Sequence, residues 1–306
     1  MSGLLDSSER SELVGGPLAG RVAVVTGAAR GQGRSHCLRL AADGADIVAI
    51  DLCGELATTD YAGSARADLD ATTDAVTAMG VGCAAVVADV RDLPAMSGAV
   101  EQGLGALRRD AGTSRHVDIV VANAGIAGGS PIEFMTAHAW QEMIDVNLTG
   151  VWNTIKAVIP SMLANPRLRV NGGSGTGSIV LISSANGGLK APPNLAHYAA
   201  AKHGVVGVMR SLAGELGERG IRVNSIHPTA VDTSMIHNDF TYRLFRPDLD
   251  APGRDDVVEL FRSYHSLPVP WIDAADVSEA VAFLASDAAR YITGVMLPVD
   301  AGLSSR

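Results

Sequence analysis

The sequence predicts a doubly wound α/β fold, in which one domain is built on a parallel sheet with helices on both faces. Seven short runs rich in Val, Ile and Ala recur along the chain, with helical stretches between them. Runs that are apolar throughout suit strands buried on both faces, and the intervening helices imply right-handed crossovers. At 306 residues, 47% of them hydrophobic, the chain can fill one large core.

The expected strands follow these runs, at residues 21–27, 45–52, 82–90, 117–125, 177–185, 221–228 and 294–302. Alanine is the best helix former, so the run AHYAAAKHG is expected to be helical. No repeat or linker divides the chain, so residues 21–306 should form a single domain after a flexible leader at 1–20. The Gly/Ser tract at residues 171–178 lacks a phosphate-loop pattern and is expected to be a surface turn.

The charge balance argues against two classes of partner. The formal net charge is −9 and Lys and Arg form no cluster, which disfavours nucleic acid and an anionic membrane surface. No apolar run is long enough to span a bilayer, and the N-terminus has no signal-peptide pattern. We therefore expect a cytoplasmic protein that acts on a small molecule.

No metal site is expected from the cysteines or the histidines. Cys37, Cys53 and Cys83 are an odd number, lie far apart and lack the paired spacing of a zinc site or a disulfide framework. Free thiols suit a reducing cytoplasm. Three histidines lack a carboxylate or cysteine at ligand spacing: His197, His203 and His227.

A glycine-rich turn joins the first expected strand to the helix after it. In TGAARGQG, Gly27, Gly31 and Gly33 permit a tight turn and a close approach of backbone to a ligand. We expect the helix to begin after Gly33 and to direct its free N–H groups toward a pyrophosphate. Asp51 ends the second strand roughly 20 residues on, where a carboxylate would bind ribose hydroxyls. This combination predicts a Rossmann-type dinucleotide site; the alternative is a turn that only packs helix on strand.

Asp51 also favours NAD over NADP, because its charge repels a 2′-phosphate. Arg30 opposes this interpretation, since a cation in the glycine turn can accept that phosphate. The residues after Asp51 supply no second cation, so Asp51 carries more weight. The cofactor-binding candidates in this part of the chain are Gly27, Arg30, Gly31, Gln32, Gly33, Asp51 and Leu52.

Tyr198 and Lys202 lie four residues apart in the alanine-rich helix, so they share one face. An ordinary exposed pair is the alternative. Moving a hydride between an alcohol carbon and nicotinamide also requires a group that exchanges a proton with the substrate oxygen. A free phenol titrates near 10, so Tyr198 would need its pKa lowered by about 3, and the Lys202 ammonium can supply much of that change.

Several motifs, taken in order, resemble the short-chain dehydrogenase/reductase family and cover the chain from about Arg21 to its end. They are TGxxxGxG, ADV with Asp89, NAG at 123–125, IDVNLTG with Asn147, ISSANG with Ser184, and the YxxxK of Tyr198 and Lys202. Within the family, the extra segment at about 53–69 and HPTAVDTSM from His227 resemble the mycofactocin-associated, carveol-dehydrogenase-like subgroup.

The resemblance implies a role for each matched catalytic residue. Tyr198 would be the acid/base, and Lys202 would also bind the nicotinamide ribose. Ser184 would hydrogen-bond the substrate oxygen as charge develops there. Ser183 is its rival, because the spacing from Ser184 to Tyr198 is one residue longer than the family pattern. Asn147 would bind a carbonyl or hold a water, or else be a partly exposed polar residue.

The remaining expected cofactor contacts follow the ends of the third, fourth and sixth strands: Asp89, Val90, Asn123, Ala124, Gly125, Pro228, Val231 and Thr233. The resemblance places Asp89 at the adenine, whereas capping the next helix is the alternative. Asn123 and Gly125 would also suit a plain turn. Thr229 stands where the family usually has glycine.

Residues 234–271 concentrate aromatic side chains in a chain that is only 4% aromatic. We expect this segment to cover a hydrophobic alcohol or ketone such as a terpenoid, with subunit contact or core as the alternative. The resemblance implies a homotetramer. It also implies that the 53–69 insertion covers the adenosine, so that an external redox carrier reoxidises bound NAD in place; a plain surface loop is the alternative.

We therefore expect an NAD-dependent dehydrogenase that acts on a secondary alcohol. The alternatives are a conventional 3-oxoacyl or steroid-type reductase with freely exchanging NAD(P), and a non-catalytic NAD-binding redox sensor. A sensor would have lost Tyr198 or Lys202, and both are present. An epimerase or dehydratase of the extended branch would show a different glycine spacing and a longer substrate domain.

Overall fold

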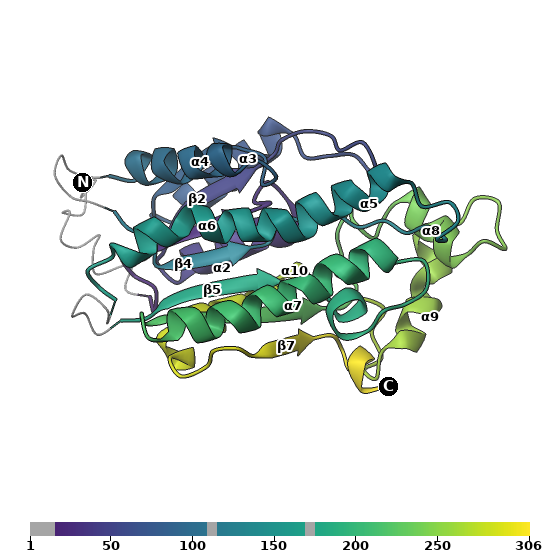
Figure 1. Ribbon diagram of the computed structural model, residues 1–306. Helices are drawn as coiled ribbons and strands as arrows, with labels where there is room; N and C mark the ends of the chain where they lie inside the picture. Colours follow the sequence, from purple (N-terminus) through teal and green to yellow (C-terminus); the bar gives the residue numbers. More distant parts are fainter. Residues whose placement is uncertain (1–15, 109–114, 169–174) are drawn as a thin grey trace, which may run out of the picture.

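The computed structural model describes residues 16–108, 115–168 and 175–306. A seven-stranded parallel sheet, in the order β3-β2-β1-β4-β5-β6-β7, lies between two layers of helices (Figure 1). The strands are β1 (Val22–Thr26), β2 (Asp46–Asp51), β3 (Cys83–Val87), β4 (Ile119–Ala122), β5 (Gly177–Ile182), β6 (Ile221–Pro228) and β7 (Met296–Val299). The predicted fold class and all seven predicted strands are confirmed.

The helices of one layer are α4 (Leu93–Ala106), α6 (Gly150–Leu163) and α7 (Ala196–Gly217), and those of the other are α2 (Gly31–Ala42), α3 (Arg66–Thr77) and α10 (Ala274–Ala285). The remaining helices are α5 (Ala137–Ile144), α8 (Asp239–Phe245) and α9 (Arg254–Tyr264), with π-helical turns η1 (Asp145–Thr149) and η3 (Ala185–Leu189) and 3-10 turns η4 (Asp287–Ala289) and η5 (Leu303–Ser305). None of the helices in the described ranges has the length and apolar content that a membrane span requires.

Successive strand residues face the two helix layers in turn, which explains why the runs are apolar without a break. In β1, Val22 and Val24 pack toward α4, α6 and α7, whereas Ala23 and Val25 pack toward α2, α3 and α10. All five residues of β1 are buried. Two cores therefore share one sheet, as expected for parallel strands covered on both faces.

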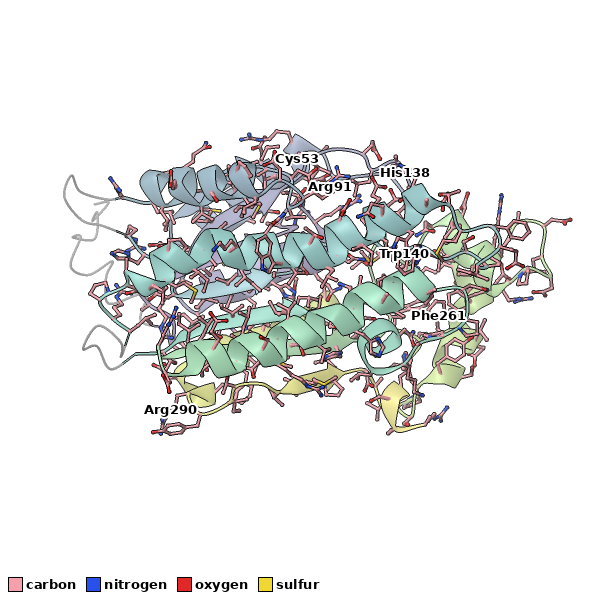
Figure 2. All side chains as sticks on the ribbon, viewed as in Figure 1. Cys53, Arg91, His138, Trp140, Phe261 and Arg290 are labelled. Carbon is pink, nitrogen blue, oxygen red and sulfur yellow. The ribbon has the colours of Figure 1, made fainter. Side chains whose placement is uncertain are left out.

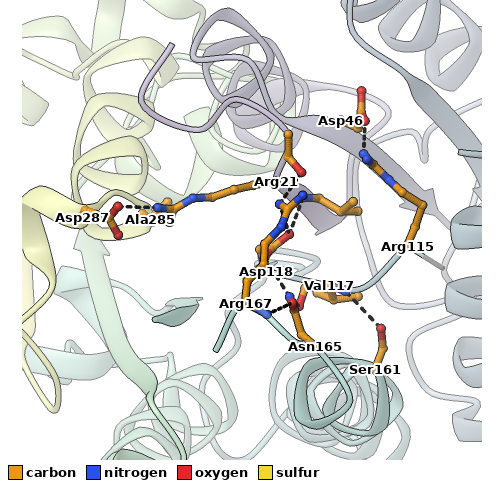
Figure 3. Close-up of polar contacts among 12 residues, drawn as sticks. Arg21, Asp46, Arg115, Val117, Asp118, Ser161, Asn165, Arg167, Ala285 and Asp287 are labelled. Carbon is orange, nitrogen blue, oxygen red and sulfur yellow. Dashed lines mark hydrogen bonds and ion pairs between the residues drawn. The ribbon is translucent and has the colours of Figure 1, made fainter. Parts of the chain in front are cut away.

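Polar side chains fasten the amino ends of the strands (Figure 3). The buried Asp118 carboxylate accepts hydrogen bonds from the Val22 N–H (2.9 Å) and from the Asn165 side chain (2.8 Å). On the neighbouring side, Arg21 pairs with Asp287 at 2.6 Å. These contacts tie strand starts to helix ends, and they leave the opposite, carboxyl edge of the sheet for the site.

The packed domain begins earlier than the expected leader boundary at residue 20. Residues 1–15 lie outside the described part of the chain. Leu18, however, is fully buried, and its N–H donates to Asp43 O at 2.9 Å. Burial of this leucine stabilises the fold, so residues 16–20 belong to the packed domain and not to a leader. In the Gly/Ser tract, residues 171–174 are not described, and Gly177 already begins β5.

Two glycines of α4 provide a matched test of the packing between helix and sheet. A Cβ at Gly103 would overlap the Val48 side chain, whereas a Cβ at Gly105 meets nothing within 4 Å. We expect Gly103→Ala to lower the free energy of unfolding by about 1–3 kcal/mol, because the valine is fixed in the core. Gly105→Ala should raise it by up to about 1 kcal/mol through helix propensity. Urea denaturation measures both, and equal effects would contradict this account of the packing.

Candidate active site

Two adjoining cavities open at the carboxyl edge of the sheet, near the point where the strand order reverses between β1 and β4. Ligands bind at this point in open α/β sheets. The glycine turn, the ends of β2, β3 and β4, and the segment after β2 line the first cavity. Residues 228–245 and Phe261 line much of the second. Six residues border both cavities: Gln32, Tyr61, Ser183, Tyr198, Thr233 and Met235.

The structure brings most of the predicted site residues together. Those that line the first cavity are Gly27, Arg30, Gly31, Gln32, Gly33, Asp51, Leu52, Asp89, Val90, Asn123, Ala124, Gly125, Tyr198, Lys202 and Thr233. Pro228, Val231 and Ser184 line the second cavity instead. Asn147 borders neither cavity.

The glycine turn leaves backbone donors facing the first cavity. Helix α2 begins at Gly31, so the expectation that it starts after Gly33 is wrong, and the last glycines form its first turn. The capping residue Arg30 makes no side-chain hydrogen bond to the helix start. A Cβ at Gly33 would overlap Gly27 O, and Gly27 has a φ of +66°. Only glycine fits both positions, and the free N–H groups can receive an anion.

Asp51 connects the glycine turn to the segment after β2. One carboxylate oxygen accepts from the Ala29 N–H at 2.9 Å. The other accepts from the Cys53 N–H at 3.0 Å and from the Ser64 hydroxyl at 2.5 Å. A carboxylate has about four acceptor positions, so one remains for a ribose hydroxyl.

The segment after β2 folds over the first cavity and is anchored along its length. Residues 66–69 of the expected 53–69 insertion are the first turn of α3, so the loop itself covers 53–65. Leu56, Thr59, Tyr61, Gly63 and Ser64 all line the cavity. Arg30 donates to Ala62 O, and the Ala127 N–H donates to the Tyr61 hydroxyl at 3.2 Å.

A buried carboxylate on α5 provides a further anchor. Glu142 accepts from the Thr58 N–H (2.9 Å) and hydroxyl (2.6 Å), and its other oxygen lies 3.1 Å from the Arg91 guanidinium. Burial alone would raise the pKa of Glu142, but the hydrogen bonds from Thr58 and the charge of Arg91 lower it. Figure 2 labels Cys53, where the loop begins, and Arg91 at the same edge of the molecule.

Asp89 is paired with a neighbour rather than capping a helix. Arg91 holds its carboxylate at 2.6 Å, and this pairing lowers the pKa of Asp89 although burial acts in the opposite direction. Helix α4 is capped by Asp92, whose side chain accepts from the Ala95 N–H at 2.9 Å. The capping alternative for Asp89 is therefore wrong, and its carboxylate borders the first cavity.

Asn123 fastens the end of β4 to the glycine turn. Its side-chain amide donates to Thr26 O at 2.9 Å. The Thr26 hydroxyl accepts from the N–H groups of Asn123 and Ala124, both at 3.1 Å. Asn123 thus combines the structural role of a turn residue with a place in the cavity wall.

Asn147 lies in a π-helical turn between α5 and α6, not inside one continuous helix as expected. Its amide accepts from the Ile126 N–H (2.9 Å) and donates to Ile126 O (2.8 Å). The side chain is fully buried, so the partly exposed alternative is wrong. The widened turn aims Asn147 at the loop after β4, which it holds in place, and such turns are frequent at functional sites.

Tyr198 and Lys202 lie on the buried face of α7 and are not an exposed pair. Lys202 is 4% exposed, donates to Ile182 O at 3.0 Å, and lies with Nζ 5.8 Å from the centre of the Tyr198 ring. Burial lowers the pKa of Lys202 to about 8. Burial also raises the pKa of Tyr198, although a Ser184 hydrogen bond opposes it, so the expected lowering is not found in the protein alone.

The two neighbouring serines have different partners. The Ser183 hydroxyl donates to Lys202 O at 3.1 Å, whereas Ser184 hydrogen-bonds the Tyr198 side chain. This geometry favours Ser184 over Ser183 as the group that meets a substrate oxygen.

A buried histidine that the sequence did not single out for this role positions Ser184. His227 Nδ1 lies 3.1 Å from Ser184 O, and its Nε2 lies 2.8 Å from the Ser225 hydroxyl. A carbonyl only accepts, so Nδ1 carries the proton and Nε2 accepts from Ser225. Burial lowers the pKa of His227 to about 4, which keeps the ring neutral.

The second cavity is apolar on the side formed by α8 and α9. Phe240, Phe245 and Phe261 line it, and the rings of Phe245 and Phe261 are 4.7 Å apart. Phe261, labelled in Figure 2, is itself buried. The hydroxyl of Thr229, the residue that replaces the family's glycine, lies 2.6 Å from His265 Nε2 and so ties the strand end to the residue that follows α9.

Glu142 provides a test of the loop anchor. Its pKa is lowered, so the charged form stabilises the anchored loop at pH values above the ordinary Glu pKa, and this stabilisation is lost as pH falls through the lowered value. We expect Glu142→Gln to increase amide hydrogen exchange across residues 53–65 at neutral pH by severalfold, whereas the exposed Glu133→Gln should not. Wild-type protein should approach the variant on acidification. If the amides of residues 53–65 exchange equally slowly in both variants at neutral pH, Glu142 does not anchor the loop.

The geometry can be compared with known proteins. The family model for short chain dehydrogenases matches residues 21–243. The chain is 46% identical to the (-)-trans-carveol dehydrogenase of Rhodococcus erythropolis, across 92% of this chain and 97% of that protein.

Two crystal structures extend the comparison. Carveol dehydrogenase from Mycobacterium avium in complex with NAD is 51% identical, with a TM-score of 0.88 over 95% of this chain and all of the other. A short chain dehydrogenase from Mycobacterium paratuberculosis bound to NAD is 38% identical, with a TM-score of 0.82 and the same coverage of both chains. This protein belongs to the short-chain dehydrogenase family.

Proposed function

We propose that this protein is an NAD-dependent dehydrogenase that interconverts hydrophobic secondary alcohols and ketones, with Tyr198 as the acid/base. One observation carries the proposal. Tyr198, hydrogen-bonded to Ser184, lies in the wall shared by a cavity with a nucleotide-binding glycine turn and an apolar cavity. A reacting carbon in the second cavity can therefore meet both a nicotinamide and a proton-transferring phenol.

The first cavity suits NAD on grounds independent of the relatives. The buried Gln32 Oε1 has no hydrogen-bond partner among the described residues. This oxygen can therefore accept a hydrogen bond from a ligand bound where the two cavities meet. The bare backbone of Gly27 and Gly33 and the free N–H groups of α2 would hold the pyrophosphate. Bound NAD would supply the hydride acceptor.

Asp51 favours NAD over NADP, and the contacts of Arg30 weaken the opposing argument. The buried Asp51 carboxylate keeps one acceptor position for a ribose hydroxyl and would repel a 2′-phosphate. Arg30 donates to Ala62 O in the loop, so part of its guanidinium is engaged there. The counterargument that Arg30 receives the extra phosphate is thereby weakened.

The protein's own residues account for the proton chemistry. Burial keeps Tyr198 protonated, which suits donation to a ketone oxygen. In alcohol oxidation the phenolate form of Tyr198 must accept the proton of the alcohol hydroxyl. The Ser184 hydrogen bond favours the phenolate, and the Lys202 ammonium acts in the same direction when charged. When a ketone binds, the single O–H of Ser184 turns from Tyr198 to the substrate oxygen, and Ser184 and Tyr198 then both donate to that oxygen as charge develops.

We propose that the substrate is terpenoid-like and that the 53–65 loop retains NAD between turnovers. The aromatic lining of the second cavity and the likeness to carveol dehydrogenases support the first point. The anchors of the loop at Asp51, Glu142 and Arg30 support the second. Retained NAD would require an external redox carrier, as the resemblance to mycofactocin-associated enzymes implies.

We also propose a homotetramer in the cytoplasm. Trp140 and Trp152 are 40% and 47% exposed on α5 and α6, an unusual position for large apolar side chains unless another surface covers them. Cys37, Cys53 and Cys83 are free thiols, which a reducing compartment preserves. A conventional enzyme with freely exchanging cofactor is the second candidate, but an anchored loop over the first cavity disfavours it.

Tyr198→Phe tests the proposed function. Because it removes only the acid/base hydroxyl, we expect folding and bound nicotinamide to be retained and kcat to fall by about 100-fold or more. Turnover is measured with a panel of secondary alcohols and an artificial dye acceptor. Tyr291→Phe, at a side chain that is 78% exposed, is the control. If Tyr198→Phe keeps more than a tenth of the wild-type kcat, Tyr198 is not the acid/base.

A further inference from the structure

Tyr61 differs from the other loop residues because it reaches the second cavity. Leu56, Thr59, Gly63 and Ser64 border the first cavity only, whereas Tyr61 borders both. Its neighbours in the second cavity include Ala127, Gly128 and Tyr198. The loop that covers the cofactor side therefore also supplies part of the wall around the substrate.

The Tyr61 hydroxyl has an unused proton. Its oxygen accepts from the Ala127 N–H at 3.2 Å, and no hydrogen bond within the described residues uses its O–H as donor. A phenol carries one donor, and on this half-buried side chain it is free to bind a ligand in the cavity. Burial raises the pKa of Tyr61, so the hydroxyl keeps its proton near neutrality.

Tyr61 and Tyr198 lie in the wall that the two cavities share. Both side chains border both cavities. A substrate oxygen held by Tyr198 therefore lies in the same part of the cavity as the free donor of Tyr61.

The number of lone pairs decides which atom this donor can meet. A carbonyl oxygen has two lone pairs, and the proposed function uses both, one for Tyr198 and one for Ser184. In the bound, uncharged ketone both positions on that oxygen are then filled. We propose that Tyr61 is a specificity-determining residue that donates a hydrogen bond to a second oxygen of the substrate. The inference rests on the proposed function and deepens it: the favoured substrate is a hydrophobic ketone or alcohol that carries an additional acceptor oxygen.

Ketone binding tests this inference without turnover. Protein with oxidised NAD cannot reduce a ketone, so dissociation constants can be measured by calorimetry. The probes are 2-, 3- and 4-methoxycyclohexanone, each paired with the ethylcyclohexanone of the same shape, in which CH2 replaces the ether oxygen. The quantity compared is the dissociation constant of the ethyl compound divided by that of the methoxy compound. For at least one isomer, we expect this ratio to be about fivefold to tenfold larger in wild-type protein than in Tyr61→Phe.

Leu56→Ala is the matched control. Leu56 borders the first cavity only, so this variant should keep the methoxy preference while it weakens the cover of the cofactor. Tyr61→Phe keeps the ring but loses the bond from the Ala127 N–H, so both proteins are saturated with NAD before their dissociation constants are compared. The inference is overturned if wild-type protein prefers the methoxy compound for none of the isomers. It is also overturned if Tyr61→Phe keeps the preference. Failure of every alcohol to react in wild type would instead overturn the proposed function, and the ketone affinities remain readable.

Discussion

The buried carboxylate of Asp51 is the contact on which the site depends. It accepts from Ala29 in the glycine turn, from Cys53 where the loop begins and from Ser64 near its end. Hydrogen bonds to a charged acceptor are roughly twice as strong as neutral ones, so one side chain fixes three backbone segments. The shape of the first cavity and the position of the loop over it follow from this arrangement.

Burial shapes the chemistry of the proposed catalytic residues as much as their spacing does. Burial shifts the pKa values of Tyr198 and Lys202, in each case in the direction that makes the charged form less favourable than in water. Hydrogen bonds from Ser184 to Tyr198 and from Lys202 to Ile182 O compensate in part. His227 in turn holds Ser184 through its carbonyl. The site is thus a set of buried polar groups, each satisfied by a neighbour on another element.

Much of the fold could be predicted because the signals were periodic or local. Buried parallel strands produce uninterrupted apolar runs, and the glycine spacing marks a turn that no other residue fits. The YxxxK spacing placed Tyr198 and Lys202 on one helix face, as the structure has them. In each of these cases one short segment of sequence is enough to predict the local structure.

The remaining features depend on contacts between distant segments. Asn147, in a π-helical turn, bonds Ile126 in the loop after β4, and the hydrogen bond from Thr58 to Glu142 joins the loop after β2 to helix α5. Neither contact leaves a periodic pattern in the sequence. The protein alone does not show the expected lowering of the Tyr198 pKa, because spacing to a cation is visible in a sequence, whereas burial of the phenol is not. His227 gave no signal beyond being a polar residue near a strand end, and Ser64 gave none beyond being a polar residue in a loop.

The central claim is that the 53–65 loop holds the cofactor through successive turnovers. Exchange of bound nicotinamide with isotopically labelled NAD, followed by mass spectrometry beside a single-turnover measurement, tests it most directly. The account predicts near-stoichiometric nicotinamide in protein purified without added cofactor, and exchange far slower than one turnover. Complete exchange within the time of a single turnover would contradict it and leave the loop as a surface decoration of a conventional dehydrogenase.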